Sequence, residues 1–424
     1  MNNIGIVGTG IAGLHLALFL QSHDRNVTLY GERRPEDYRE ARLSNTVIRQ
    51  EHTRARERAL GVHHWDGPSS DVPTWRYEVR AERNLRFEGR QSAPANAVDM
   101  RLYEARLLQD FVERGGALEI GVVTASDLPE RAACHDLLVI ASGRGGLSDT
   151  FERDPLRSPF ERPQRLVVGG LFSGVNLEDP LAFRLTITPG IGEIFEIPQL
   201  SFDGPVMAYG IEAVPGGPLH AFATATYAPG EFEAALPEVL REYAPQAFAR
   251  VQPDHLRLTG SLDFFQGAVT PVVRRAHAEL EGGQRVMAVG DALAAHDPIV
   301  GQGANVASAC AWALGECIVV AKSFDEAFYQ DAENRLRAVL RPSVEWTNSM
   351  LGQPSPQRMA LMVACARQPE VAEAFVGLVG DPARMWAVAE TPEGVSGFLD
   401  GLGVATGQLP ANSDPAMSNP FARD

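Results

Sequence analysis

Apolar residues recur along this chain with two different periods, and the period changes at a few points. Near the N-terminus, short continuous apolar runs at 4–7 and 26–30 flank a longer apolar run at 14–20. This order is typical of a buried strand, a helix and a second buried strand. Similar short runs return at 137–141 and 286–289. The pattern predicts an α/β protein with a Rossmann-like domain.

The middle and the end of the chain have other patterns. From about 163 to 268, short alternating segments are separated by Pro and Gly turns, which favours an antiparallel sheet with 219–223 as one strand. We expect an arginine-rich loop at 39–58, a helix from about 98 to 114, and helices from 325 to about 400. The predicted division is 1–160 and 269–325 for the two parts of the Rossmann-like domain, 161–268 for the antiparallel-sheet substrate domain, 326–405 for a helical C-terminal region, and 406–424 for a disordered tail.

A G-x-G-x-x-G motif lies between the first strand and the first helix. Gly8 makes the turn, Gly10 admits a pyrophosphate, and Gly13 lets the helix pack on the strand. Glu32 ends the second strand, 19 residues after Gly13, where an acid binds the adenosine ribose. A solvated surface role for Glu32 stays open, because Arg33 follows it at once. The cofactor contacts expected from this half of the site are Gly8, Gly10, Ile11, Ala12, Gly13, Glu32 and Arg33.

A second motif follows the apolar run at 286–289. Asp291 at the strand end can accept a ribityl hydroxyl, and a helix that begins near Gly303 can stabilise negative charge on a flavin ring. The two halves together predict FAD as the cofactor. His296 and Asp297 could form an acid–base dyad, but we favour a role in shaping the flavin turn, and Asn305 could be a helix cap instead of a ligand. The expected contacts from this half are Gly290, Asp291, Pro298, Gly301, Gly303, Ala304 and Asn305.

Length and composition limit the alternatives. A chain of 424 residues exceeds the usual size of a single core, so two lobes are expected. The formal net charge of −16 argues against nucleic acid or an anionic membrane as a partner. The four cysteines have neither C-x-x-C nor metal-ligand spacing, and His63-His64 has no third ligand nearby, so we expect no metal. With no signal peptide and no apolar stretch of about 20 residues, a cytoplasmic enzyme is expected.

With both halves of a flavin site and an interposed sheet, the chain resembles the FAD-dependent aromatic hydroxylase fold, and within it the oxygenase component of two-component styrene and indole monooxygenases. The resemblance is carried by segments 4–20, 42–47, 97–103, 158–164, 192–202 and 290–305. It implies an enzyme that takes reduced FAD from a separate NADH-dependent flavin reductase. With O2 the flavin would form a C4a-hydroperoxide, which oxygenates a vinyl arene or the C2–C3 bond of indole.

The resemblance also implies roles for particular residues. Arg42, Leu43 and Arg101 would contact the cofactor, although surface or helix salt bridges are alternatives for the two arginines. Arg49 stands where styrene-type members tend to have His. Ala95 stands where styrene-type members tend to have Ser, and in this it is more similar to indole-type members. The catalytic and pocket residues that the resemblance implies are Asn45, Val47, Arg49, Ala95, Pro298 and Ile299.

The expected substrate pocket is apolar, with Asn45 as its one polar contact. Because a buried unpaired guanidinium would be costly, we expect Arg49 to turn outward or to pair with Glu51 or Asp99. Further apolar wall candidates are Leu43, Val47, Ile299 and one of Val206, Tyr209 and Ile211.

The sequence has no recognisable nicotinamide fingerprint. Single-component members of this fold carry an Asp-Gly pair just after the strand at 137–141, whereas this chain reads Ala141-Ser142-Gly143-Arg144-Gly145-Gly146. Nor does a second G-x-G-x-x-G follow a strand. The sequence therefore predicts a monooxygenase that receives reduced FAD from a separate reductase and acts on a small aromatic substrate. A single-component NAD(P)H-dependent hydroxylase, a non-catalytic flavin-binding protein and a homodimeric assembly stay open.

Overall fold

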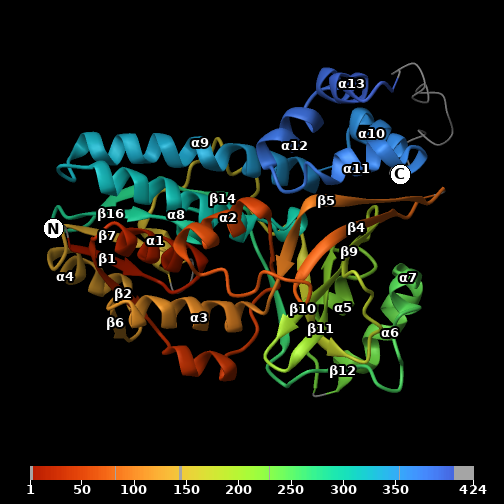
Figure 1. Ribbon diagram of the computed structural model, residues 1–424, viewed down its shortest axis with the longest axis horizontal. Helices are drawn as coiled ribbons and strands as arrows, with labels where there is room; N and C mark the ends of the chain where they lie inside the picture. Colours follow the sequence, from red (N-terminus) through yellow and green to blue (C-terminus); the bar gives the residue numbers. More distant parts are fainter. Residues whose placement is uncertain (1–2, 82, 143–145, 229, 353, 405–424) are drawn as a thin grey trace.

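The computed structural model describes residues 3–81, 83–142, 146–228, 230–352 and 354–404, and it contains two large sheets covered by helices (Figure 1). The tail predicted at 406–424 and residues 143–145 of the glycine turn lie outside the described residues. The mixed α/β fold confirms the predicted fold class.

The first sheet has six strands in the order β15-β16-β7-β1-β2-β6. β1 pairs in parallel with β2 and with β7, and β16 pairs in parallel with β7. The carboxyl ends of these strands therefore meet at one edge, so the two glycine-rich motifs, which lie far apart in the chain, become neighbours. The strands are β1 (Asn3–Val7), β2 (Asn26–Gly31), β6 (Ala117–Ile120), β7 (Leu137–Ile140), β15 (His277–Glu279) and β16 (Arg285–Ala288).

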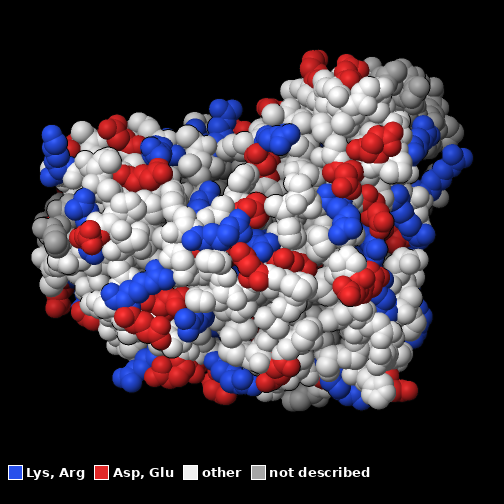
Figure 2. Space-filling view, in the orientation of Figure 1, with Lys and Arg blue, Asp and Glu red and all other residues white. Residues whose placement is uncertain are grey.

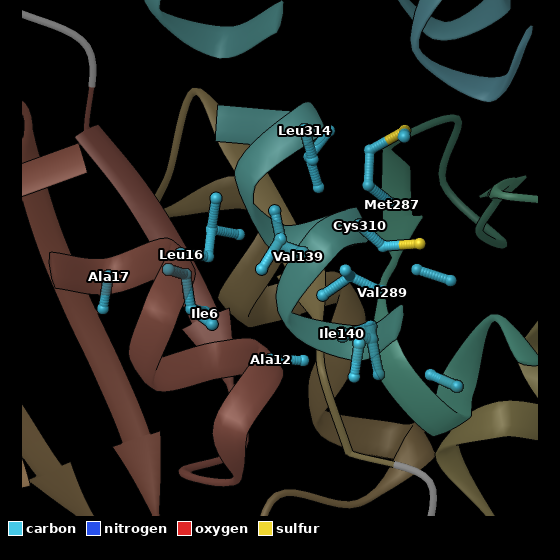
Figure 3. Close-up of a cluster of buried hydrophobic side chains, with 14 of the residues drawn as sticks. Ile6, Ala12, Leu16, Ala17, Val139, Ile140, Met287, Val289, Cys310 and Leu314 are labelled. Carbon is cyan, nitrogen blue, oxygen red and sulfur yellow. The ribbon is translucent and has the colours of Figure 1, made fainter. Parts of the chain in front are cut away.

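Two apolar helices, α1 (Ile11–Ser22) and α8 (Gly303–Val320), pack against each other and cover this sheet. Figure 3 shows Ile6 of β1 and Val139 of β7 gathered with Leu16 of α1 and Leu314 of α8. All four side chains are fully buried, and each contributes about 1.5–3 kcal/mol of hydrophobic stabilisation. This core fixes the N-terminal ends of α1 and α8 beside the carboxyl edge of the sheet.

α8 is more apolar than the sequence analysis expected. Its 18 residues have a mean hydropathy of 1.4, so by length and composition alone it could cross a membrane, and it is the one helix among the described residues that passes this test. However, 56% of its residues are buried inside the protein, where the helix packs between α1 and α9 (Glu326–Leu351). Its apolar character is that of a core helix.

The second sheet follows the strand order β12-β8-β11-β10-β9-β4-β5-β3, and β13 also pairs with β8. Most of its pairs are antiparallel, as predicted, although β4 and β9 run in parallel. The strands are β3 (Ile48–Arg49), β4 (Asp71–Val79), β5 (Leu85–Ala97), β8 (Leu166–Ser173), β9 (Ala182–Thr188), β10 (Gly192–Ser201), β11 (Gly204–Ala213), β12 (Arg257–Leu258) and β13 (Phe264–Ala268).

The structure differs from the sequence prediction in three segments. β3, β4 and β5 fall within 1–160 but belong to the second sheet, so that part of the chain contributes to both lobes. Residues 219–223 were expected as a strand but largely form helix α5 (His220–Thr224). The periodicity of such a short apolar run does not distinguish a helix from a strand. The loop expected at 39–58 contains helix α2 (Glu51–Leu60), whose buried face carries Arg54 and Glu57 and therefore has no apolar period.

Helices cover the second sheet at both ends. α6 (Glu231–Tyr243) and α7 (Pro245–Phe248) were not expected within 161–268. Beyond 325 the chain is helical, as predicted, and α10 and α11 pack on β5 (Figure 1). The four last helices each carry Pro in the first turn, where its missing N–H costs nothing. They are α10 (Pro356–Arg367), α11 (Pro369–Val376), α12 (Pro382–Ala389) and α13 (Pro392–Gly401).

Charges of both signs are interspersed on the face in Figure 2. Among the described residues, exposed ion pairs include Arg58 with Glu51 and Arg76 with Glu88. Exposed pairs of this kind contribute little to stability, about 0–1 kcal/mol each. This face therefore offers no broad basic field that would attract a polyanion.

Candidate active site

A cavity of about 1830 Å³ runs from the carboxyl edge of the first sheet across one face of the second sheet to the C-terminal helices. Both glycine-rich motifs line one end of it, which we call the cofactor end. The other end, which we call the sheet end, is lined by strands β4, β9, β10 and β11 and by helices α9 to α12. The two lobes thus share a single continuous space.

The G-x-G-x-x-G turn lies at the cofactor end. Gly8 and Gly10 line the cavity, and a Cβ at Gly10 would meet only the Glu104 carboxylate at 3.8 Å, so the backbone at the start of α1 is open to a ligand. Gly13 instead faces the strand, because a Cβ there would lie 2.0 Å from the Gly8 carbonyl oxygen. The helix can pack this closely only with glycine. The remaining lining residues of this half are Ile11, Ala12, Glu32 and Arg33.

The second motif completes the cofactor end. Asp297 accepts a hydrogen bond from the Ile299 N–H at 3.2 Å and so caps the Pro298–Val300 turn, which was the preferred role for this residue. Gly301 follows with a φ of 62°, and no atom lies within 4 Å of a Cβ at Gly301 or Gly303. The start of α8 is therefore open to the cavity. The lining residues are Gly290, Asp291, Pro298, Ile299, Gly301, Gly303 and Ala304.

These features fit an extended dinucleotide such as FAD. Two helix N-termini with uncovered backbone face one space, and both attract negative charge. Gly8, Gly10 and the start of α1 would hold the pyrophosphate, with Glu32 at the ribose. Asp291, exposed on the cavity wall, would meet the ribityl chain.

Asn305, expected as a cofactor ligand, lies outside the cavity wall and acts as a clamp. Its Nδ2 donates to the carbonyls of Ile48 at 3.0 Å and Gly301 at 3.2 Å. Its Oδ1 accepts from Gln50 N–H at 2.8 Å and from the Thr53 hydroxyl at 2.9 Å. With all these bonds made inside the protein, Asn305 joins α8 to the segment that leads into α2. The capping alternative is thus nearer to its role.

The three residues expected on the cofactor from segments 42–47 and 97–103 also lie off the cavity. Arg101 is buried and pairs with Asp99 at 2.6 Å and Asp263 at 2.7 Å. Arg42 is exposed, and its Nε donates to the Phe264 carbonyl at 3.3 Å. Leu43 packs in the core of the second lobe. For Arg101 the salt-bridge alternative is therefore the one that the structure supports.

Arg49 is fully buried and lies outside the pocket. Its Nε is 2.8 Å from Oε1 of Glu57, its guanidinium donates to Asn96, and it lies 4.2 Å from the centre of the Tyr103 ring. The pairing was predicted, but Glu51 and Asp99 were the wrong acids. Glu57 is two turns into α2, a helix that the sequence analysis missed.

The Arg49–Glu57 pair belongs to a buried network. The Tyr103 hydroxyl donates to Glu57 at 2.9 Å and accepts from His15 Nε2 at 2.7 Å, which leaves His15 Nδ1 to accept from the Ser308 hydroxyl at 2.9 Å. Burial, and then the nearby arginines, lowers the pKa of His15 to about 3, so its ring is neutral. The network ties α1, α3 (Met100–Glu113), α8 and α2 together behind the cofactor end.

The sheet end begins at Asn45 and Val47, which line the cavity as predicted. Ala95 does not: it is completely buried in the core of the second lobe. Tyr209 and Ile211 face away, because alternate residues of β11 point to opposite sides and the cavity side carries Gly210 and Glu212. Val206 shares the side of Gly210 but packs in the core of the second lobe, outside the cavity wall. Aromatic and apolar side chains dominate this end: Trp75, Tyr77, Phe183, Leu185, Phe195, Ile197, Phe265, Trp346, Met350, Met362 and Phe375.

One group in the cavity wall was missed by the sequence analysis. Arg165, Glu193 and Glu212 of the sheet end line the cavity together with Asp297 of the turn before α8, and each is at least nine-tenths buried. Polar residues at every second position of otherwise apolar strands, such as Glu193 before Phe195, were the available signal. We call these four residues the acid cluster. The expectation of a pocket with Asn45 as its one polar contact is therefore wrong.

The adjacent histidines at 63 and 64 have an ordinary structural role. His64 Nε2 lies 2.5 Å from Oδ2 of Asp110. No group of three or more His, Cys, Asp or Glu with metal-binding geometry occurs among the described residues.

Comparison with known proteins identifies the family to which this chain belongs. The family described as "Styrene monooxygenase A putative substrate binding domain" matches residues 143–250. Styrene monooxygenase StyA of Pseudomonas fluorescens is 38% identical over 396 residues, which is 92% of this chain and 95% of the relative. The match therefore extends over most of the chain.

Solved structures share the fold at low identity. A flavoprotein/dehydrogenase from Cytophaga hutchinsonii has a TM-score of 0.65 and 13% identity, with 95% of this chain and 97% of that one covered. A flavin-dependent brominase has a TM-score of 0.61 and 14% identity, with 95% and 98% covered. The fold is thus a Rossmann-like flavoprotein fold. From the glycine-lined cofactor end and the extent of the sequence match, this chain is a flavin monooxygenase and belongs to the family of styrene monooxygenase oxygenase components.

Proposed function

We propose that this protein takes reduced FAD from a separate NADH-dependent flavin reductase and oxygenates the alkene of a styrene-type compound or the C2–C3 bond of indole. One oxygen atom of O2 goes to the substrate and the other leaves as water, with two electrons from the reduced flavin and two protons. When bound, the flavin would activate O2 as the C4a-hydroperoxide expected from the family resemblance.

The observation that carries the proposal is the continuity of the cavity. A cradle of glycine backbone and helix N-termini opens directly onto a wall of aromatic and apolar side chains. The alkene itself supplies the electrons that attack the oxygen donor, so the protein need only bind both partners, orient the alkene and exclude water. Val47, Phe183 and Phe195 are placed to exclude water, and Asn45 lies between the two ends.

The test is an assay with purified protein, FAD, NADH and styrene or indole, with and without an added flavin reductase. We expect epoxide or indole oxidation products only when the reductase is present, and almost no NADH consumption without it. Rapid NADH oxidation by this chain alone, stimulated by substrate, would favour the single-component hydroxylase. Flavin binding without product under either condition would favour the non-catalytic alternative.

A further inference from the structure

The acid cluster contains more negative than positive groups. Arg165 and Glu193 form a bidentate pair, with Nε–Oε2 at 2.7 Å and Nη2–Oε1 at 3.0 Å, so both oxygens of Glu193 are occupied. Glu212 lies directly opposite Glu193 in the β10–β11 ladder, and Asp297 approaches from the turn before α8. Two carboxyl groups therefore remain after the single guanidinium of the cluster has been paired.

The remaining carboxyl groups each have an oxygen that no described group satisfies. Glu212 is 3% exposed and Asp297 is 1% exposed, yet Glu212 Oε2 and Asp297 Oδ2 have no hydrogen-bond partner among the described residues. Buried polar atoms without a partner are rare, and a native protein that keeps them has a use for them. Both residues line the cavity, so a ligand there can reach these atoms.

The charges that face this pair decide its protonation. Burial, and then Asp297 and Glu193, raises the pKa of Glu212 well above its usual value, while Arg165 opposes the shift. Burial also raises the pKa of Asp297 to about 6. Burial lowers the pKa of the neighbouring His296 to about 4, so that ring adds no positive charge. The shift favours the protonated form of Glu212, whereas Asp297, with a pKa of about 6, is largely ionised at neutral pH and can accept a hydrogen bond.

The space beside the pair suits a flat ring. Gly210, two residues before Glu212 on the same face of β11, has no side chain, and a Cβ there would meet only Cβ of Phe195 at 4.0 Å. Phe265 lines the same space, and its ring would contact a Cβ at Gly169, the residue opposite Gly210 on β8. An aromatic ring over Gly210 would lie between two phenylalanines, with one edge toward Glu212.

We propose that Glu212 and Asp297 are specificity-determining residues that accept a hydrogen bond from a ring N–H, so that the cavity prefers bicyclic aromatic substrates of the indole class to pure hydrocarbons of the same shape. This inference rests on the proposed function, because it concerns the substrate of the same cavity. A purely apolar pocket discriminates only weakly between two rings of nearly the same shape, whereas a site discriminates against a substrate that leaves its buried polar group unpaired.

The test measures binding to FAD-saturated protein without reductase or NADH, so that no turnover occurs. The dissociation constants of indole and of indene, a carbocycle of nearly the same shape that lacks the N–H, are determined by calorimetry at pH 7.5. We expect indole to bind at least about tenfold more tightly than indene, which corresponds to one hydrogen bond to a charged group. In the double variant Glu212→Met, Asp297→Asn the ratio should fall below about threefold.

A matched control is Asp203→Asn, which changes an exposed carboxylate in the turn of the same β10–β11 hairpin and should leave the ratio unchanged. If the double variant does not fold, the wild-type ratio at pH 5 replaces it, and it should fall at least about threefold because Asp297, with a pKa of about 6, is then largely protonated. Equal affinities for indole and indene, or a ratio that persists in the variant and at pH 5, would overturn the inference while leaving the proposed function intact. If neither compound binds, the proposed function itself fails, and the inference with it.

Discussion

At the cofactor end of the cavity the ligand-facing surface is mostly backbone, whereas at the sheet end it is mostly side chains. The cofactor end consists of two short contiguous motifs, each a strand, a glycine turn and a helix start. The sheet end draws single residues from β4, β9, β10, β11 and the four helices α9 to α12. Substitutions that alter the ligand-facing surface of the cofactor end are therefore limited to a few glycines and acids. At the sheet end, single side chains can be substituted one at a time without loss of the fold. This division allows a fixed cofactor and an adjustable substrate.

The strongest test of the backbone end is Gly13→Ala. A Cβ 2.0 Å from the Gly8 carbonyl oxygen must push α1 away from the first strand, which moves the N–H groups expected to bind the pyrophosphate. We expect FAD affinity to fall by more than about 100-fold, the loss of two good charge-assisted hydrogen bonds. The control is Gly397→Ala in α13, where no atom lies within 4 Å of the new Cβ. Unchanged FAD binding in Gly13→Ala would mean that the motif does not hold the cofactor.

Asp291 is the side chain on which the cofactor end depends most. Its carboxylate should accept a charge-assisted hydrogen bond from the ribityl chain, so Asp291→Ala should weaken FAD binding by about 10- to 100-fold. Fluorescence titration of FAD measures the effect. An affinity within about twofold of the wild-type value would show Asp291 to be an ordinary strand-end acid.

Asp297, in the turn where the two ends of the cavity meet, would link the proposed substrate recognition to stability. An unfolded Asp releases its proton near pH 4, but burial raises the pKa of Asp297 to about 6, so between these values the folded state binds more protons. Its contribution to stability is therefore full below about pH 4 and declines as pH rises to about 6. Relative to Asp297→Asn, the wild type should lose about 1–3 kcal/mol of unfolding free energy across this window. Parallel pH dependences in urea unfolding would contradict the assignment.

The smallest effect is expected from Ala95→Ser. Ala95 is completely buried and lies outside the cavity wall, so a hydroxyl there cannot reach the substrate. The ratio of initial rates with indole and styrene at equal reductase flux should change by less than about twofold, because no substrate hydrogen bond is gained. A larger change would place Ala95 in the pocket, as the resemblance to indole-type members had suggested.

The two ends also differ in how far the sequence predicted them. Gly8, Gly10, Glu32, Asp291 and Gly301 were found because backbone geometry demands glycine or an acid at fixed spacing within a contiguous segment. Within the same motif, Asn305 was predicted to bind the cofactor but makes four hydrogen bonds inside the protein. The sequence alone does not distinguish an amide buried in this way from one that faces a ligand.

Residues away from the contiguous motifs were placed less well. Arg49 finds Glu57 only because α2 forms, and that helix has a polar buried face. The acid cluster joins β10, β11, the residue before β8 and the turn before α8, so strand register is needed to see that Glu193 and Glu212 are neighbours. A one-residue error in the facing of β11 is also what put Tyr209 and Ile211 on the wall in place of Gly210 and Glu212.

In the proposed function, reduced flavin and an aromatic alkene bind in one cavity, and this protein does not itself oxidise a nicotinamide cofactor. A single-turnover experiment tests it most directly: photoreduced FAD, bound anaerobically to the protein with no reductase and no NADH, is mixed with oxygenated buffer and styrene or indole. We predict oxygenated product approaching one equivalent per bound flavin, and none when oxidised FAD and NADH replace reduced FAD. Oxidation of the bound reduced flavin with only hydrogen peroxide released, for both substrates, would contradict it.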